Sequence, residues 1–352
     1  MAVNAVSTNG TFVYNVNNTA TQVLAAKQVK ENIFAKVLHR NGKGVTEEYA
    51  TNASSVRIFK VIPTGNRARE LGATYNGGYF NNKDAKQVTV KEYDLNLLYI
   101  MDLPVDLPEV QQDMVSVNIF DETTKNLAGE NALEINASTI AHQLKPIWDA
   151  AYAAQSWTGL AIELASTPDY LGALQDASAI LDDGDPDNYI QSFPFEGRQA
   201  LISAKMRRGM MAKGQVLIGG SNFAQSMLAK GGLDPEATKD FGEFYLGEID
   251  LIPIYLMPKA VRDEATVWGG GSNVFDGVEG IVCSAIATDR GISTLDYIKV
   301  VDSQAGPGKR LQPKTRWGIN VCYPKGIVPI VAHGTSATEV TITAPDSVQV
   351  GG

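Results

Sequence analysis

Residues 56–93 read VRIFKVIPTGNRARELGATYNGGYFNNKDAKQVTVKEY. Apolar and polar residues alternate along residues 55–63 and again along residues 86–93, and this period of two predicts β-strands. The intervening residues, 64–85, are rich in glycine, asparagine and charge, and a loop of this length in a compact domain tends to be functional. A two-stranded ribbon is only marginally stable by itself in water. We therefore expect an extended hairpin whose support comes from outside its own subunit.

The net charge changes sign along the chain. Between Val56 and Lys91, seven basic residues are balanced by two acidic ones, which leaves +5. Between Asp94 and Glu134, nine acidic residues are balanced by Lys125 alone, which leaves −8, and the whole chain carries −9. An arm of one sign beside a body of the other favours the binding of one copy to the next. This pattern indicates a self-assembling structural protein and not an enzyme.

A long helix is expected from residue 121 to residue 154. Its 34 residues would span about 50 Å at 1.5 Å per residue. Asp121 or Thr123 is the expected N-cap, and Glu122 in the first turn complements the helix dipole. Apolar residues at steps of three and four mark one buried face, namely Leu133, Ala137, Ile140, Leu144, Ile147, Ala151 and Ala154. Pro146 lies inside this helix and should kink or interrupt it.

The rest of the chain predicts a mixture of short strands and helices, and therefore an α+β fold. Residues 2–21 carry almost no charge and little periodicity, which favours an extended N-terminal arm. Further helices are expected at residues 20–38, 168–181, 199–214 and 222–229. Further strands are expected at residues 95–107, 215–221, 248–257, 280–288, 297–301, 317–331 and 339–343.

Composition excludes several classes of protein. At 352 residues with 44% hydrophobic and 20% charged residues, the chain is long and apolar enough to bury a globular core. The acidic balance argues against broad nucleic-acid binding, which needs lysine and arginine to displace phosphate counterions. We expect neither a signal peptide nor a membrane span, because no suitable apolar run occurs. Cys283 and Cys322 are expected to be reduced thiols, not a disulfide.

Motifs for catalysis, metals or nucleotides are not found. His39, His142 and His333 are far apart and have no acidic or cysteine partner at metal-ligand spacing. The glycine runs at residues 219–221 and 269–272 complete no nucleotide-binding fingerprint. Trp148 and Trp157 are expected to pack in the core or at an interface. No catalytic residue, metal site or cofactor is therefore predicted.

A cluster of four aspartates follows the helix expected at residues 168–181. Its members are Asp182, Asp183, Asp185 and Asp187. Their spacing is faintly similar to a calcium loop, but the required glycine and the closing glutamate are not in place. A helix end followed by a turn is the better interpretation.

Three segments, taken with the order of the expected elements, resemble one known family. They are MVSVNIFD (residues 114–121), LGEIDLIPIYL (residues 246–256) and WGINVCYPKGIVPI (residues 317–330). The chain resembles the major capsid proteins of tailed bacteriophages, which share the Hong Kong 97-type fold. This resemblance implies an N-terminal arm, an extended β-hairpin loop, a long spine helix in a peripheral domain, and an axial domain.

The resemblance also implies boundaries along this chain. The N-terminal arm would be residues 1–29, the first part of the peripheral domain 30–55 and the extended loop 56–93. Residues 94–191 would continue the peripheral domain, with the spine helix at about 121–154. The axial domain would be 192–308, the return strands of the peripheral domain 309–332 and the C-terminal tail 333–352.

The function implied by the resemblance is self-assembly. Hexamers and pentamers of the chain would form an icosahedral phage head, built in the host cytoplasm, that encloses double-stranded DNA without sequence-specific binding. Expected partners are further copies, a portal, a scaffolding protein that is separate or removed, and in some cases a decoration protein. No cofactor or membrane is implied, and no covalent crosslink can be assigned.

The residues that we expect to carry the contact between copies are charged. Near the loop tip, Arg67, Arg69, Lys83 and Lys86 would lie over Asp113, Asp121, Glu122 and Glu130 of an adjacent copy. Exposed ion pairs contribute only about 0–1 kcal/mol each, so these would set register and orientation more than affinity. The alternative is that the loop charges only keep the protein soluble.

Three other readings of the sequence remain open. An encapsulin, which is a nanocompartment shell of the same fold, would contain enzyme cargo in place of DNA. A tail or baseplate protein would form rings or tubes. An unrecognised α+β enzyme would stay a small oligomer and would need a pocket with convergent polar groups.

Overall fold

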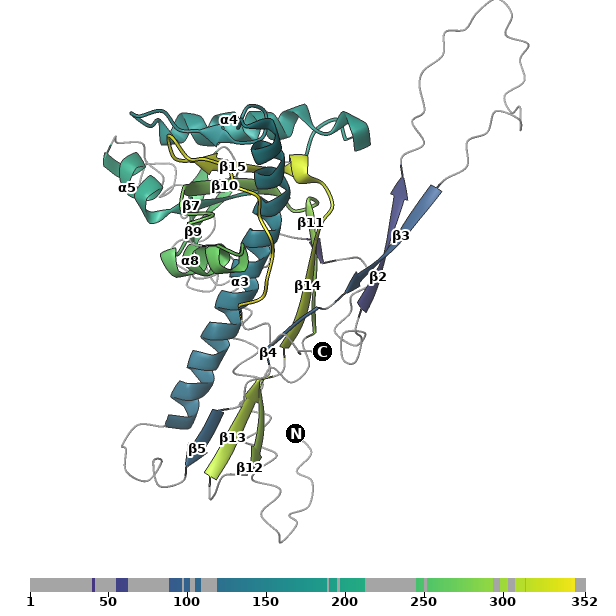
Figure 1. Cartoon of the computed structure of the whole chain (residues 1–352), viewed down its shortest axis with the longest axis vertical. Helices are drawn as coiled ribbons and strands as arrows, with labels where there is room; N and C mark the ends of the chain where they lie inside the picture. Colours follow the sequence, from purple (N-terminus) through teal and green to yellow (C-terminus); the bar gives the residue numbers. More distant parts are fainter. Residues whose placement is uncertain are drawn as a thin grey trace, which may run out of the picture.

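Figure 1 shows the computed structural model of the chain. The structure describes residues 40–41, 55–62, 89–96, 98–101, 105–108, 119–188, 190–194, 197–212, 245–249, 252–271, 273–293, 298–302, 308–313 and 315–345. Several predictions fall outside these residues. They are the N-terminal arm, the helices at 20–38 and 222–229, the strand at 215–221 and the tip of the extended loop.

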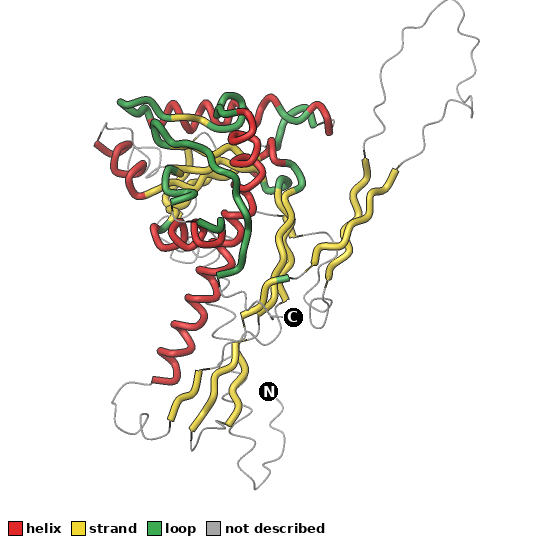
Figure 2. The backbone as a smooth tube through the Cα atoms, in the orientation of Figure 1, coloured by secondary structure: helices red, strands yellow, loops and turns green. Residues whose placement is uncertain are grey.

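The expected hairpin strands are confirmed as a two-stranded antiparallel sheet. β2 (Ser55–Ile62) pairs with β3 (Thr89–Asn96) over its full length, from Ser55↔Asn96 to Ile62↔Thr89. In Figures 1 and 2 these two strands form a ribbon that projects away from the rest of the described chain. The period of two in the sequence was therefore sufficient to find both strands.

The expected long helix is also confirmed, as α3 (Ile119–Ala154) with 36 residues. Pro146 does not interrupt it. Proline removes one backbone donor, but the side chains on either side of it, Leu144, Ile147 and Trp148, are completely or almost completely buried. Their burial contributes roughly 1.5–3 kcal/mol per large apolar side chain, which offsets the roughly 3 kcal/mol cost of a proline in a helix.

A six-stranded mixed sheet forms the centre of the molecule. In spatial order its strands are β6 (Ile162–Glu163), β15 (Ile327–Val331), β10 (Val278–Ser284), β7 (Arg198–Ser203), β9 (Ile252–Met257) and β8 (Tyr245–Ile249). The β6–β15 and β7–β9 pairs are parallel, and the other pairs are antiparallel. Strands from distant parts of the sequence therefore lie side by side.

Alternate residues of this sheet enter two separate hydrophobic clusters. In β10, Ile281 and Cys283 pack in the cluster that includes α3 and α8 (Lys259–Trp268), whereas Val282 packs with α4 (Tyr170–Asp183) and α5 (Ala204–Ala212). Successive side chains of a strand point to opposite faces. The sheet is therefore covered by α3 and α8 on one face and by α4 and α5 on the other.

Two smaller sheets complete the described fold. The four-stranded sheet has the order β1 (Arg40–Asn41), β11 (Thr288–Ser293), β14 (Thr315–Val321) and β4 (Tyr99–Met101). The three-stranded sheet has the order β12 (Ile298–Asp302), β13 (Gly308–Pro313) and β5 (Val105–Pro108). Short 3-10 helices, η2 (Pro186–Asn188) and η4 (Pro324–Gly326), lie in turns.

α3 packs against the four-stranded sheet partly through buried polar side chains, which we call the polar seam. Its hydrogen bonds run from Asn131 to Thr315, from Gln143 to Thr288 and from Trp317 to Ser138, with donor–acceptor distances of 3.5, 3.1 and 2.9 Å. Apolar contacts tolerate small shifts, whereas each of these bonds needs one relative position. The seam therefore sets the register of α3 along the sheet.

The helix predicted at residues 199–214 is wrong in its first half. β7 occupies residues 198–203, and only α5, from Ala204 to Ala212, is helical. Ala200, Leu201 and Ile202 are almost fully buried between β10 and β9. Pairing with strands that lie far away in the sequence overrides the local helical pattern there.

The last predicted strand, at residues 339–343, is wrong as well. The structure assigns no strand there, although the Val340 amide donates to Asp149 and the Thr343 amide donates to the Trp268 carbonyl, at 2.9 and 3.0 Å. The segment runs as a loop along α3 (Figure 2). Its backbone amides form hydrogen bonds with residues of α3 and α8 and not with a neighbouring strand.

Arg198 is a fully buried cation that ties α4 to the central sheet. Its guanidinium donates to the carbonyl oxygens of Phe193 and Ser178 and to the carboxylate of Asp182, the last at 2.5 Å. The side chain of Arg198 is 0% exposed, whereas that of Asp182 is 50% exposed. A buried charge is tolerated only when its hydrogen bonds are satisfied, so this cluster holds the end of α4 in place.

We expect Arg198→Met to destabilise the folded chain by about 2–4 kcal/mol, because it leaves buried carbonyl groups without their donors. The measurement is the free energy of unfolding by urea. Arg208→Met is the matched control, since Arg208 is exposed and should change that energy by less than about 0.5 kcal/mol. Equal effects of the two substitutions would contradict the role given to Arg198.

Candidate functional site

The predicted contact between copies falls mostly on residues outside the described ranges. These are Arg67, Arg69, Lys83, Lys86 and Asp113, and nothing is described of the side chain of Asp121 in α3. Glu122 and Glu130 are described, and both are exposed on the first turns of α3. Their exposure is compatible with a partner, but the ion pairs themselves stay a prediction.

The base of the ribbon is anchored to the body through β4, which follows β3 closely in the sequence. β4 pairs with β14 in the register Tyr99↔Trp317, and β3 also contacts β14. Near the end of β3, Leu95 is buried. The ribbon is therefore held at its base, whereas β2 and β3 extend beyond the body (Figure 1).

Four rings meet where β4, α3, α8 and β14 come together, and we call them the aromatic cluster. Its members are Tyr99, His142, Trp268 and Trp317. The Tyr99 ring centroid lies 4.7 Å from that of Trp268, nearly perpendicular to it, and 5.5 Å from that of His142. Edge-to-face aromatic pairs each add about 0.5–1.5 kcal/mol to the burial energy. The cluster therefore joins the base of the ribbon to the long helix.

The hydrogen bonds of His142 determine its tautomer. Its Nδ1 atom lies 2.7 Å from the Ser138 carbonyl oxygen, which can only accept, so Nδ1 carries the proton. Its Nε2 atom then accepts from the Tyr99 hydroxyl at 2.9 Å. Burial lowers the pKa of His142 below its ordinary value, and the positive charge of Lys145 acts in the same direction. The folded chain therefore favours the neutral form of the ring.

We expect His142 to make the folded state less stable in acid. The unfolded chain binds this proton with an ordinary pKa of 6.5, and the folded chain binds it more weakly. The unfolded state therefore gains protons first as the pH falls below 6.5, which lowers the free energy of unfolding, whereas above that pH the effect is absent.

The measurement is urea unfolding between pH 7 and pH 5, compared with His142→Gln. The variant should lose less stability than the parent over this range, because glutamine does not titrate. His333→Gln is the control, since that side chain is mostly exposed. Parallel curves for the parent and His142→Gln would contradict the assignment.

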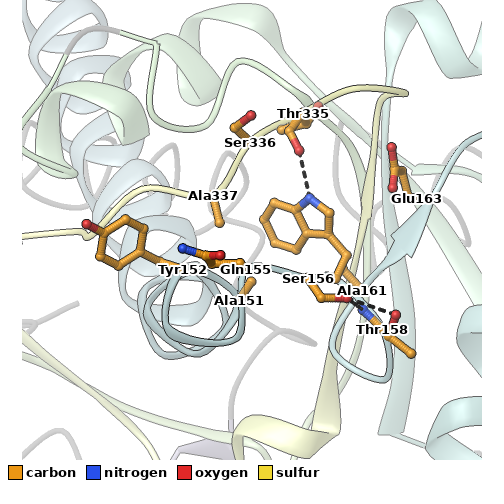
Figure 3. A pocket seen from close by; sticks show the side chains of 11 residues that line it. Ala151, Tyr152, Gln155, Ser156, Thr158, Ala161, Glu163, Thr335, Ser336 and Ala337 are labelled. Carbon is orange, nitrogen blue, oxygen red and sulfur yellow. Dashed lines mark hydrogen bonds between the residues drawn. The ribbon is translucent and has the colours of Figure 1, made fainter.

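A cavity of about 650 Å³ opens at the C-terminal end of α3 (Figure 3). It is lined by Ala151, Tyr152, Gln155, Ser156, Trp157, Thr158, Ala161, Glu163, Thr335, Ser336 and Ala337. The Trp157 indole donates to the Thr335 carbonyl at 2.7 Å, and the Ser156 hydroxyl donates to the Thr158 hydroxyl at 2.9 Å. No lining hydroxyl is paired with a base, so the cavity does not have the arrangement of a nucleophilic site.

The aspartate cluster after α4 forms a helix end and a turn, as expected. Asp182 binds Arg198, and Lys325 reaches Asp185 and Asp187 at 3.1 and 2.7 Å. Gly184 ends the helix with a φ of 68°, a value that favours glycine. Within the described ranges, no group of three or more histidine, cysteine or acidic side chains could hold a metal ion.

Both cysteines are reduced thiols, as expected. Complete burial raises the pKa of Cys283 to about 12, so this thiol is not a nucleophile. Cys322 is partly exposed, and its Sγ atom donates to Asp289 at 2.9 Å. None of the helices in the described part of the chain is both long and apolar enough to cross a bilayer.

No protein-family model and no curated protein matches this sequence. Solved structures do resemble the fold. The capsid of Ralstonia phage GP4 aligns with a TM-score of 0.52 and 12% identity, over 87% of this chain and 88% of that chain. The chain has the Hong Kong 97-type capsid fold. The expected α+β class and capsid fold are thereby confirmed, and α3 and the ribbon are two of the elements on which the resemblance rested.

Two other capsid-like structures align with lower scores. The capsid of cyanophage P-SCSP1u has a TM-score of 0.47 and 14% identity, over 86% of this chain and 92% of that chain. A virus-like particle from Pyrococcus furiosus has a TM-score of 0.43 and 11% identity, over 89% of this chain and 99% of that chain. Identities this low show a shared fold and no more, so the capsid fold of this chain rests on the phage GP4 alignment.

Proposed function

We propose that the chain is the major capsid protein of a tailed bacteriophage. It would be a structural subunit and not an enzyme, found in the virion. Hexamers and pentamers, assembled in the host cytoplasm, would form an icosahedral head around double-stranded DNA. The fold shared with the capsid of Ralstonia phage GP4 supports this proposal.

The projecting ribbon is the observation that carries the proposal. β2 packs mainly against β3 within the described chain, and an isolated two-stranded ribbon is only marginally stable in water. A fold that maintains such a ribbon needs a surface for it elsewhere, and further copies supply that surface. The aromatic cluster holds the base of the ribbon against α3 and so fixes the direction in which it projects.

The proposed contact between copies is electrostatic at the ribbon tip. Arg67, Arg69, Lys83 and Lys86 would lie over Asp113, Asp121, Glu122 and Glu130 of the adjacent copy. Each exposed pair would contribute about 0–1 kcal/mol, so apolar burial and copy number must supply most of the affinity. Weak single contacts allow misplaced subunits to leave before a shell closes.

The domain boundaries expected from the sequence are part of the proposal. In it, α3 is the spine helix of the peripheral domain, and residues 192–308 form the axial domain. The central sheet contains β6 and β15 from the proposed peripheral segments beside β7, β9 and β10 from the proposed axial segment. Because they share one sheet, the two domains would move together. A portal, a scaffolding protein and in some cases a decoration protein would be the other partners.

Electron microscopy of the purified protein tests the function. Closed shells are expected, and DNA with a portal in particles from infected cells would support the phage head. Closed shells that carry protein cargo would instead favour the encapsulin-type nanocompartment. Open tubes or rings would favour a tail protein, and a small oligomer at high concentration would contradict every shell-forming function.

The ribbon contact predicts the behaviour of Arg67→Glu/Arg69→Glu. Reversed charges should repel the acidic surface of the neighbouring copy, so shell yield should fall by about tenfold or more. Circular dichroism should stay unchanged, because the sheets and helices of the described chain build the hydrophobic core. Lys259→Glu is the control, since it reverses an exposed charge on α8. Normal shells from the double variant would refute the electrostatic contact but not the capsid function.

A further inference from the structure

Two neighbouring helices on one face of the central sheet carry opposite charge. α4 has three acidic residues and no basic residue, whereas α5 has three basic residues and no acidic residue. They are Asp176, Asp182 and Asp183 in α4, and Lys205, Arg207 and Arg208 in α5. The net charges of −3 and +3 are therefore complementary.

Part of this charge is already paired inside the chain. Asp182 binds the buried Arg198, and Lys205 binds the buried Glu279 at 2.7 Å. No ion pair of Asp176 or Asp183 occurs within the described residues. Two exposed carboxylates of α4 therefore remain available to a partner outside the subunit.

The arginines of α5 are also unpaired by any acid in the described chain. The Nε atom of Arg207 is buried without a hydrogen-bond partner, and Arg208 donates only to the backbone of its own helix, at Ala204. Arg208 is exposed, so the remaining donors of its guanidinium are accessible to an acceptor from another molecule. The α5 surface therefore lacks an acceptor that α4 of another copy carries.

Asp183, at the far end of α4, lies too far from α5 to be neutralised by it within one subunit. α5 touches the start of α4, where a Cβ atom on Gly209 would lie 2.1 Å from the ring of Tyr170. Asp183 is thirteen residues further along α4, or roughly 20 Å at 1.5 Å per residue. That distance is about twice the screening length in physiological salt.

The shapes of the two surfaces also suit contact. Asp176, Ala179 and Asp183 follow one another at steps of three and four on the exposed side of α4, with a small residue at the centre. On α5, Met211 is 59% exposed beside the arginines. Methionine and arginine are enriched at protein interfaces relative to other surfaces. A large apolar side chain among unpaired cations is therefore typical of a binding surface.

We infer that the exposed acidic stripe of α4 in one copy, Asp176, Ala179 and Asp183, binds the face of α5 that carries Arg207, Arg208 and Met211 in the next copy. This inference rests on the proposed function of self-assembly. The two surfaces differ, so the contact is head-to-tail and builds a ring when its rotation closes. It is separate from the ribbon contact, since it uses neither β2 nor β3.

Charge exchange between the two helices tests the inference. Two double variants are compared, Arg207→Glu/Arg208→Glu and Asp176→Lys/Asp183→Lys. Each should assemble about tenfold more slowly than the parent, as measured by light scattering. The protein with all four substitutions restores complementary charges and should assemble within about threefold of the parent rate. An equimolar mixture of the two double variants should recover six-membered rings, in which copies can alternate with opposite charges, but not five-membered rings, in which two like copies must meet.

Controls separate assembly from folding. Each variant is examined by circular dichroism and thermal unfolding as a dissociated subunit, and Lys259→Glu on α8 should assemble at the parent rate. Because Arg207 is partly buried, its substitution could disturb folding, so Arg208→Glu and Asp183→Lys are also tested as single variants. Each should slow assembly, and the protein that carries both should recover the parent rate.

The outcomes distinguish this inference from the proposed function. Closed shells from the parent, together with unaffected double variants, would overturn the inference and leave the function standing. If the variant with all four substitutions folds but does not recover assembly, the inference is overturned as well. A parent protein that never forms shells would overturn both.

Discussion

Burial of α3 between two sheets is the constraint on which the rest of the fold depends. One side of the helix packs apolar side chains such as Leu144 and Trp148 against α8 and the central sheet, and another side forms the polar seam. The apolar side supplies most of the energy, whereas the seam sets the position along the axis. The cavity, the aromatic cluster and the base of the ribbon are all placed by this helix.

The charged groups of the molecule divide into two kinds. Arg198, Glu279 and Asp185 are buried and satisfied within the chain, and they connect elements that are distant in the sequence. Asp176, Asp183 and the arginines of α5 are more accessible and lack an ion pair within the described part. The first kind stabilises one subunit, and the second kind suits contacts between subunits. The net charge of −9 does not reveal this division, because it does not show which charged side chains are buried.

Sequence reasoning succeeded where structure is local. Alternation found β2 and β3, and steps of three and four found α3 and α4, because each pattern is visible within a few residues. It failed at β7, where pairing with β9 and β10 decides the conformation, and at residues 339–343. It missed α8, although Val261, Ala265 and Trp268 after Pro258 carry the signal. The predicted ion pairs at the ribbon tip involve a second copy, and one sequence does not show where a second copy lies.

The position of β15 has a consequence for synthesis of the protein. This strand, residues 327–331, lies between β6 and β10 in the central sheet, so the sheet is incomplete until residues 327–331 have left the ribosome. Pairing across such long sequence separations is slow, and the waiting strand edges are prone to aggregate. The folded subunit therefore forms only after residues 327–331 have been synthesised, and until then β6 and β10 lack the strand that pairs with both.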